Sequence, residues 1–299
     1  MESIVAKLDA ALYPAVCSVN TYLSNYILVF LLVAVGLWYS IKTRFIQVRC
    51  FGEGMRRVFG NLTLNGKKHD SGMSSFQALA TAIAAQVGTG NIVGASGAIL
   101  TGGPGAIFWM WVIAFFGMAT IYAEATLAIK TRVKAADGTI HGGPVYYITT
   151  AFKGGFGKFL AGFFAVAIIL ALGFFGCMVQ SNSIGSTMQT AFGSVMGAGL
   201  GAKFVAICLF FFAFSTVLSW NLFGKINAIW LFGKKNPKAC TVIYTLIALV
   251  FILMGTMMSN DLVWELTDMF NNLMVIPNVI ALFALTKMVV GSAESKIAQ

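Results

Sequence analysis

The chain has 299 residues, of which 58% are apolar and only 10% are charged, and its mean hydropathy is +0.83. This composition excludes an ordinary water-soluble domain and predicts an all-α polytopic membrane protein, because apolar runs long enough to span a bilayer recur along the chain. The formal net charge of +10 does not indicate nucleic-acid binding. The basic residues are spread over loops and are explained by membrane orientation and by anionic lipid headgroups.

About seven transmembrane helices are predicted, within a single membrane domain that covers residues 1–299. Each is an apolar run long enough to cross the hydrocarbon core of a bilayer. In chain order the predicted spans are 22–41, 76–100, 106–129, 159–179, 203–223, 239–258 and 270–290. The first run lacks a small-residue cleavage site in the usual place, so we expect it to remain as a span and not to be removed as a signal peptide.

Eighteen of the twenty Lys and Arg residues fall on one side of this topology, and Lys7 and Lys203 fall on the other. The eighteen lie in the segments 42–75, 130–158 and 225–238 and in the C-terminal tail. Segment 259–269 carries three acidic residues and no basic one. Because cytoplasmic loops carry the excess of basic residues, we expect a multi-pass protein of the cell (inner or plasma) membrane, with the N-terminus outside and the C-terminus in the cytoplasm.

Residues for enzymatic or metal chemistry are sparse. The two histidines, His69 and His141, both lie in predicted cytoplasmic loops, with no carboxylate or cysteine at ligand spacing. The five cysteines are not closely paired, and two of them fall within spans, where a thiol is usually a small apolar side chain. We therefore expect no enzyme activity, no resident metal and no cofactor.

The second predicted span is interrupted in its middle by the run 86–91, Gln-Val-Gly-Thr-Gly-Asn. A dinucleotide-binding loop would require a third glycine at the position of Val93 and a preceding strand, so that interpretation fails. Irregular backbone survives inside a bilayer only where protein buries it or where it lines a polar cavity. An unwound helix there would free carbonyl groups for a small cation and N–H groups for a carboxylate. The alternative is that the glycines only allow close helix packing.

Six ordered motifs carry a resemblance to a known family of transporters. They are 84–92 (Ala-Ala-Gln-Val-Gly-Thr-Gly-Asn-Ile), 102–111 (Gly-Gly-Pro-Gly-Ala-Ile-Phe-Trp-Met-Trp), 142–147 (Gly-Gly-Pro-Val-Tyr-Tyr), 180–184 (Gln-Ser-Asn-Ser-Ile), 212–220 (Phe-Ala-Phe-Ser-Thr, then Ser-Trp) and 277–282 (Pro-Asn-Val-Ile-Ala-Leu). Together they resemble the alanine or glycine:cation symporter family, also called sodium:alanine symporters. The resemblance covers nearly the whole chain. It implies a leucine-transporter-type fold of inverted repeats with one discontinuous helix in this chain.

The chain departs from the family pattern between Phe192 and Lys203, where it has only a short Gly-Ser-Ala linker. The family would place about four more spans there, including a second broken helix with a Ser-Asn-Glu-Ala-Gly signature. Residues 1–192 thus resemble the first four family spans, 193–202 form a junction, and 203–299 resemble the last three. This is a partial version of the fold, and removing an even number of spans preserves the sidedness of both parts.

The resemblance implies a substrate site for a small neutral amino acid. Its candidate residues are Thr89, Gly90 and Asn91 around the substrate carboxylate, Gln180 and Asn182 from the fourth span, and Trp220 closing the pocket. Alternatives remain for three of them. Gln180 and Asn182 would serve equally well to cross-link helices by hydrogen bonds, and Trp220 to anchor its span at the membrane interface.

The resemblance also implies a cation site made of oxygen atoms. It combines backbone carbonyls near Gln86 and Val87 with the hydroxyls of Ser215 and Thr216, a ligand set that suits a hard monovalent ion. Sodium is the expected coupling ion, and a proton is the other candidate. The alternative for both hydroxyls is a hydrogen bond to a carbonyl of their own helix.

The sequence therefore predicts sodium-coupled symport of alanine or a similar small neutral amino acid. The expected partners are that amino acid, sodium, the lipid bilayer and, if two shortened chains restore one cavity, a second copy of the chain. The competing interpretation is an internally deleted, non-transporting membrane remnant of the same family.

Three further features accompany these predictions. Glu124 is the acid placed well inside a predicted span, and we expect it to reach the cytoplasmic interface and pair with a basic residue, although an intramembrane acid is also a functional candidate. Pro277 is expected to kink the last span, and a second helix break at Pro277-Asn278 is the alternative. Segment 42–75 mixes apolar and basic residues and is expected to include an amphipathic helix on the membrane surface.

Overall fold

The computed structural model describes residues 2–60, 75–134, 140–193, 199–233 and 235–295, and nearly all of them are helical. His69 and part of the predicted junction 193–202 lie outside this description. The chain packs as two compact units. Unit 1 consists of Met1–Ser24, Thr81–Thr101 and Ala165–Met274, and unit 2 consists of Asn25–Ala80, Gly102–Phe164 and Val275–Gln299.

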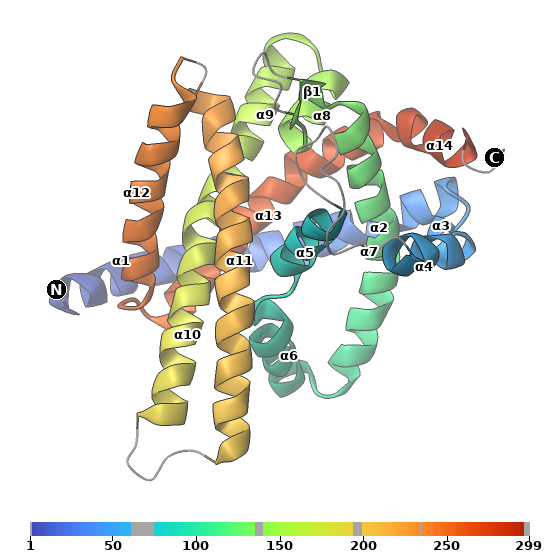
Figure 1. Cartoon of the computed structure of the whole chain (residues 1–299). Coiled ribbons are helices and arrows are strands. Elements are labelled where there is room, and N and C mark those ends of the chain that lie inside the picture. The colour runs from blue at the N-terminus through green and yellow to red at the C-terminus, as the bar shows by residue number, and fades with distance from the viewer. Residues whose placement is uncertain (1, 61–74, 135–139, 194–198, 234, 296–299) are drawn as a thin grey trace. The chain divides into compact units, whose positions relative to one another are not determined.

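The described elements are nearly all helices (Figure 1). The first half comprises α1 (Glu2–Tyr22), the π-helical η1 (Leu23–Leu28), α2 (Val29–Lys42), α3 (Ile46–Arg49), α4 (Phe51–Gly60), α5 (Ser75–Gln86), the π-helical η2 (Gly90–Gly94), α6 (Ala95–Gly102) and α7 (Gly105–Lys130). The second half comprises the short antiparallel strands β1 (Val133–Lys134) and β2 (Ile140–His141), then α8 (Pro144–Ala151), α9 (Gly154–Ile168), the π-helical η3 (Ile169–Gly176), α10 (Cys177–Phe192), α11 (Leu200–Phe232), α12 (Pro237–Gly255), α13 (Asn260–Ala284) and α14 (Thr286–Ser295).

Among the described residues, six helices are long and apolar enough to cross a membrane, and one bent pair of helices supplies a seventh candidate. The six are Ala10–Lys42, Gly105–Lys130, Gly154–Phe192, Leu200–Phe232, Pro237–Gly255 and Asn260–Ala284, and the bent pair is Leu79–Gln86 with Gly90–Gly102. Each overlaps one of the seven predicted spans, although most run longer and the last begins much earlier. The prediction of an all-α polytopic membrane protein is confirmed.

The last predicted span, 270–290, is misplaced. Its helix, α13, begins at Asn260 and ends at Ala284, so the acidic residues that suggested a loop at 259–269 lie inside the helix. Asp261 stands in its first turn, where a carboxylate interacts favourably with the positive end of the helix dipole. The charge pattern therefore indicated the beginning of a helix, and it was wrongly interpreted as a connection.

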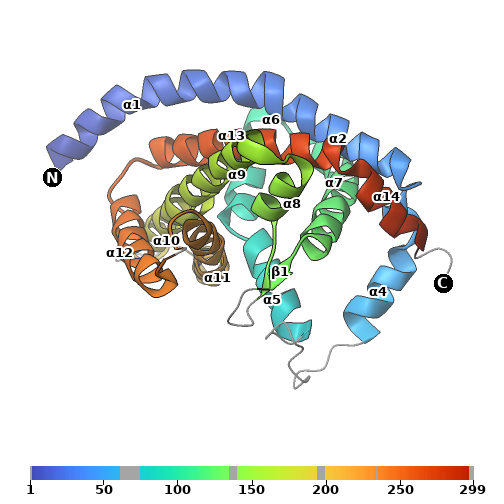
Figure 2. The ribbon, with the colours of Figure 1, turned by 90° about the horizontal axis from the view of Figure 1, so that it is seen from above.

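Unit 1 contains the helices α10, α11 and α12, which pack against one another and lie side by side in both views (Figures 1 and 2). Close approach depends on glycine. A Cβ atom built on Gly224 would lie 2.8 Å from the Cα of Gly173 and 2.2 Å from the hydroxyl oxygen of Tyr244. Phe174 stacks on Phe251 of α12, with ring centroids 4.6 Å apart. The π-helical turns of η3 include Gly173.

Unit 2 is built on α7, against which α2, α3, α8 and α14 pack. A Cβ atom on Gly36 of α2 would lie 2.9 Å from the Cβ of Phe116 and 3.2 Å from its carbonyl oxygen, so α2 and α7 are in backbone contact there. The buried Tyr39 hydroxyl donates a hydrogen bond to the Leu282 carbonyl at 2.6 Å. Gly143, with φ of 110°, precedes Pro144 at the start of α8.

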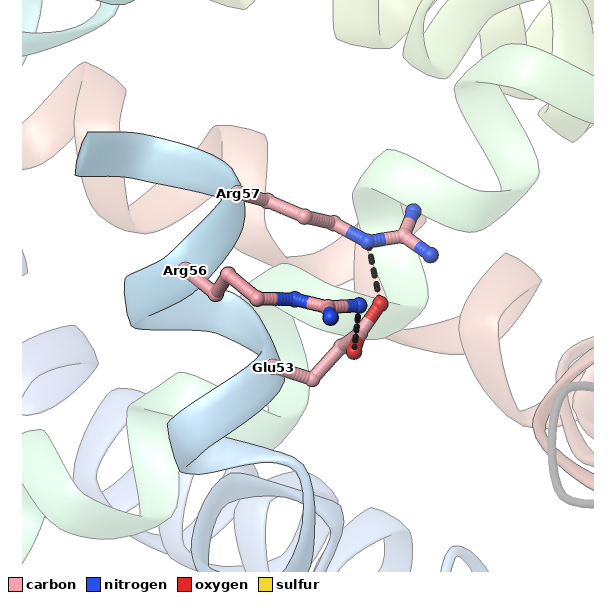
Figure 3. A network of polar contacts seen from close by, with 3 residues as sticks. All are labelled: Glu53, Arg56 and Arg57. Carbon is pink, nitrogen blue, oxygen red and sulfur yellow. Dashed lines mark hydrogen bonds and ion pairs between the residues drawn. The ribbon is translucent and has the colours of Figure 1, made fainter. Parts of the chain in front are cut away.

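Helix α4 is the amphipathic helix expected in segment 42–75. Its apolar side chains lie at helical spacing, at Phe51, Met55, Val58 and Phe59, and none of its residues is buried. On the polar face, Glu53 forms ion pairs with Arg56 at 3.0 Å and Arg57 at 2.6 Å (Figure 3). The two guanidinium groups lower the pKa of the Glu53 carboxyl, chiefly through the hydrogen bond from Arg57.

Candidate substrate and cation site

The second span breaks where the sequence predicted an interruption. Helix α5 ends at Gln86, and the helical segment that resumes at Gly90 is inclined to it by 45°. Two local bonds hold the break in place. The Asn91 side-chain oxygen accepts a hydrogen bond from the Gly88 N–H at 3.0 Å, and the Asn91 N–H donates to the Gly88 carbonyl at 3.2 Å.

These bonds change the partners of three carbonyl groups upstream. In a continuous helix the N–H groups of residues 88, 89 and 91 would donate to the carbonyls of Ala84, Ala85 and Val87. Here those N–H groups donate elsewhere, so the three carbonyl oxygens lose their helical donors. Inside a membrane such groups need other partners.

Thr216 of α11 supplies one of these partners. Its hydroxyl oxygen lies 3.0 Å from the Ala84 carbonyl oxygen, 3.0 Å from that of Val87, and 2.9 Å from that of Phe212 in its own helix. A hydroxyl has one hydrogen, so it donates to one of the three carbonyls at a time. Thr216 is fully buried, and four oxygen atoms thus gather at the break.

Trp220, one helical turn further along α11, supplies the other partner. Its indole N–H donates to the Ala85 carbonyl at 2.9 Å. Its ring also packs on η3, because a Cβ atom on Gly176 would lie 2.6 Å from the ring. The indole therefore makes specific contacts to the broken helix within unit 1, beyond what an interfacial anchor would require.

Gln180 of α10 holds the N–H side of the break. Its side-chain oxygen accepts hydrogen bonds from the Thr89 N–H at 3.2 Å and from the Thr89 hydroxyl at 3.0 Å, and both residues are buried. Gly88 lies between these groups, since a Cβ atom there would be 2.7 Å from the Thr216 hydroxyl oxygen and 3.3 Å from the Gln180 oxygen. Helices α10 and α11 thus satisfy the polar groups that the break exposes.

Other predicted site residues have contacts elsewhere. The Asn182 amide donates to the carbonyls of Gly255 at 2.8 Å and Met258 at 3.0 Å, so it links α10 to the end of α12. The Ser215 hydroxyl donates to the Phe212 carbonyl of its own helix. Gln86 is exposed, and so are Gly90 and Asn91. The binding roles assigned to these residues remain predictions.

Sequence reasoning did not identify Ala84 and Ala85. Their side chains carry no polar group, and only their carbonyl oxygens contribute. The signal was nevertheless available, because a helix that ends near residue 88 frees the carbonyls four residues upstream.

Comparison with known proteins adds independent evidence. A sequence profile of the sodium:alanine symporter family matches residues 9–200 and 185–296 of the chain. The chain belongs to the sodium:alanine symporter family. Members of this family are transporters and not enzymes, in agreement with the expectation of no enzyme activity. Among the described residues, no group of three or more His, Cys, Asp or Glu side chains could hold a metal ion.

Three relatives show the range of the family. The chain is similar to the sodium/alanine symporter AgcS of Methanococcus maripaludis (41% identity; 59% of this chain, 39% of AgcS). It is similar to the amino-acid carrier protein AlsT of Bacillus subtilis (35%; 76% of this chain, 44% of AlsT). It is also similar to the "Probable sodium/glutamine symporter GlnT" of the same organism (34%; 88% of this chain, 48% of GlnT). The chain therefore spans less than half the length of each of these relatives.

Proposed function

We propose that the chain is a sodium-coupled symporter of alanine or a similar small neutral amino acid. It acts as a multi-pass protein of the cell membrane, with its N-terminus outside and its C-terminus in the cytoplasm. The family membership and the construction of the broken helix support this proposal. The observation that carries it is the meeting of the Thr216 hydroxyl with the carbonyls of Ala84 and Val87 at the break.

The cation part of the proposal follows from the chemistry of that cluster. Hydroxyl and carbonyl oxygens are the ligands that hard cations prefer, and broken membrane helices offer such carbonyls to sodium. Thr216 and Val87 belong to the predicted set and are already in contact. We assign Gln86 and Ser215 to the same site in the sodium-bound state, with Ala84 as an additional carbonyl ligand.

The substrate part relies on the N–H side of the break. A helix that resumes at Gly90 presents N–H groups and the positive end of its dipole, which favours a carboxylate. Gly90 and Asn91 are exposed within the unit and accessible to a ligand. Thr89 and Gln180, which are hydrogen-bonded to each other, belong to the proposed substrate set, and Trp220 and Asn182 complete it.

The test is uptake of labelled alanine by proteoliposomes, with and without an inward sodium gradient. The decisive variant is Thr216→Val, which keeps the shape of the side chain and removes the hydroxyl. Loss of one oxygen ligand worth about 1.4 kcal/mol should raise the sodium concentration for half-maximal uptake about tenfold. Thr245→Val is the matched control, because that exposed hydroxyl donates only to the Thr241 carbonyl of its own helix.

Competition experiments address the substrate and the ion. Unlabelled alanine, glycine and glutamine should compete in the order of their fit to the site, and alanine is expected to compete best. Replacing the sodium gradient by a proton gradient distinguishes the two coupling ions. Well-folded chain that shows no gradient-dependent uptake would reject transport by this form. It would favour the alternative, a non-transporting membrane remnant of the family.

A further inference from the structure

Unit 2 contains a series of three hydrogen-bonded polar side chains that do not belong to the proposed transport site. It links α7, α8 and α13. The Tyr147 hydroxyl donates to the side-chain oxygen of Asn278, and the Asn278 amide nitrogen donates to the Glu124 carboxyl at 2.5 Å. Tyr147 is fully buried, and Glu124 and Asn278 are half-buried.

Glu124 has no basic partner, contrary to the expectation that it pairs with a loop residue. Among the described residues, no Lys or Arg nitrogen lies within 4.0 Å of its carboxyl; the ion pairs found there involve Glu53. Lys130, at the end of the same helix, donates instead to the Met288 carbonyl at 3.1 Å. An acidic residue inside a spanning helix without a counter-charge is costly in its ionised form.

Among the described residues, the helices packed around α7 do not provide a basic partner for the Glu124 carboxyl. On α2, Tyr39 donates to the Leu282 carbonyl and Lys42 lies over the Trp38 ring. The Arg49 guanidinium of α3 donates to the Thr43 carbonyl.

Helices α14 and α8 also do not provide a charge that would stabilise an ionised Glu124. Lys287 and Glu294 of α14 are exposed and form no ion pair among the described residues. On α8, burial raises the pKa of Tyr147 well above its usual range, so its hydroxyl stays protonated.

The hydrogen bonds of the carboxyl are compatible with a proton on Glu124. The Asn278 amide donates to one oxygen of the Glu124 carboxyl. A protonated carboxyl accepts this bond through its carbonyl oxygen and carries the proton on its other oxygen. The Asn278 amide and the Tyr147 hydroxyl are uncharged, so a neutral Glu124 leaves the buried cluster without a net charge, which the absence of a basic partner among the described residues favours.

We propose that Glu124, Asn278 and Tyr147 form a proton-binding site, in which Glu124 carries the proton at neutral pH and hydrogen-bonds the last span beside Pro277. The ligand is the proton. The site lies in a different unit from the broken helix and does not depend on transport of an amino acid. Because Pro277 removes one backbone donor from α13, the helix is weakened next to the residue that contacts the carboxyl. Movement of the helix at this point would separate Asn278 from Glu124 and expose the proton.

Infrared spectroscopy of the full chain in lipid vesicles tests the site directly. At neutral pH the wild-type spectrum should contain a protonated carboxyl band that shifts in deuterated water, and Glu124→Gln should remove it. Asn278→Ala should keep the band and shift it, because the carboxyl loses its partner; this variant serves if Glu124→Gln does not fold. Glu53→Gln is the matched control, since that exposed carboxylate is paired with two arginines and should contribute nothing to the band.

Two results would overturn the proposal. One is a wild-type spectrum that shows no protonated carboxyl band at neutral pH, or shows one that neither Glu124→Gln nor Asn278→Ala changes. The other is loss of the band when sodium replaces a bulky organic cation, which would mean that an ionised Glu124 binds sodium. A band that depends on Glu124 and is insensitive to sodium supports it.

Discussion

Gly88 lies where the broken helix approaches its two neighbours most closely. The space that a methyl group would need is already occupied by the Thr216 hydroxyl and the Gln180 side-chain oxygen. The two polar groups that satisfy the break can therefore reach it only because residue 88 has no side chain. At the residue scale, this one position controls whether the oxygen cluster forms.

Gly88→Ala should destabilise the chain by about 1 to 3 kcal/mol, as overpacking in a close contact does, and should reduce uptake. The measurements are the apparent melting temperature and the initial rate of uptake. Gly97→Ala is the control, because a Cβ atom on Gly97 meets nothing within 4 Å. Equal stability and uptake of the two variants would show that the break does not need the close approach.

At the scale of elements, unit 1 depends on the contact of α11 with η3. Gly224 and Gly173 face each other there, with the Tyr244 hydroxyl of α12 beside both. Small residues commonly allow membrane helices to approach closely, and the gain in van der Waals contact replaces the hydrophobic drive that lipid cannot provide.

Gly224→Ala should separate the two backbones and lower the apparent melting temperature, at a cost of about 1 to 3 kcal/mol. Gly185→Ala in α10 is the control, since a Cβ atom there meets nothing within 4 Å and alanine favours a helix. Thermal unfolding followed by circular dichroism in detergent would measure the difference. If both variants melt at the same temperature, the contact contributes little to stability.

Helix α4 has no buried residues, and its expected position is on the membrane surface. Its apolar side chains are exposed, and its guanidinium groups suit anionic headgroups. Because the pKa of Glu53 is lowered, its ion pairs with Arg56 and Arg57 persist at neutral pH and are lost only as pH falls through the lowered value. Being exposed, they contribute little stability, and their expected effect is on orientation.

Phe59→Trp should place an indole in contact with lipid. Its fluorescence should be quenched by lipids with brominated acyl chains, and this quenching should not change between pH 8 and about pH 5, where Glu53 remains ionised. Ile140→Trp, in β2, is the comparison, because it replaces an apolar side chain outside the candidate spans and α4. The fluorescence is read against the parent chain, which has six tryptophans of its own. Quenching no stronger than that of the comparison variant would contradict a membrane-surface position.

At the scale of the whole molecule, the proposed orientation rests on charge and on the number of spans. Six candidate spans, with the bent pair counted as a seventh, would put the two termini on opposite sides, and the distribution of positive segments would then favour a C-terminus in the cytoplasm. A membrane-impermeant maleimide should label Ser259→Cys in intact cells and Lys235→Cys only after permeabilisation, with the parent chain as background. The reverse pattern would mean that the proposed orientation is wrong.

Much of this architecture was predictable from sequence. The spans were predictable because an apolar run must match the thickness of a bilayer, and the break at 86–91 because glycines and amides are costly in the middle of such a run. The start of α13 was not, since acidic residues in a first helical turn and acidic residues in a loop give the same charge pattern.

The partners of the polar groups required the tertiary structure. The sequence by itself determined that this is a membrane protein with a broken second span and a set of polar residues near it. Only the fold decided that Thr216 and Trp220 donate hydrogen bonds to the carbonyls of Ala84, Ala85 and Val87, and that Glu124 contacts Asn278 and not a lysine. These partners lie more than 100 residues apart in the chain, and their pairing is fixed by how the helices pack, which no local pattern records.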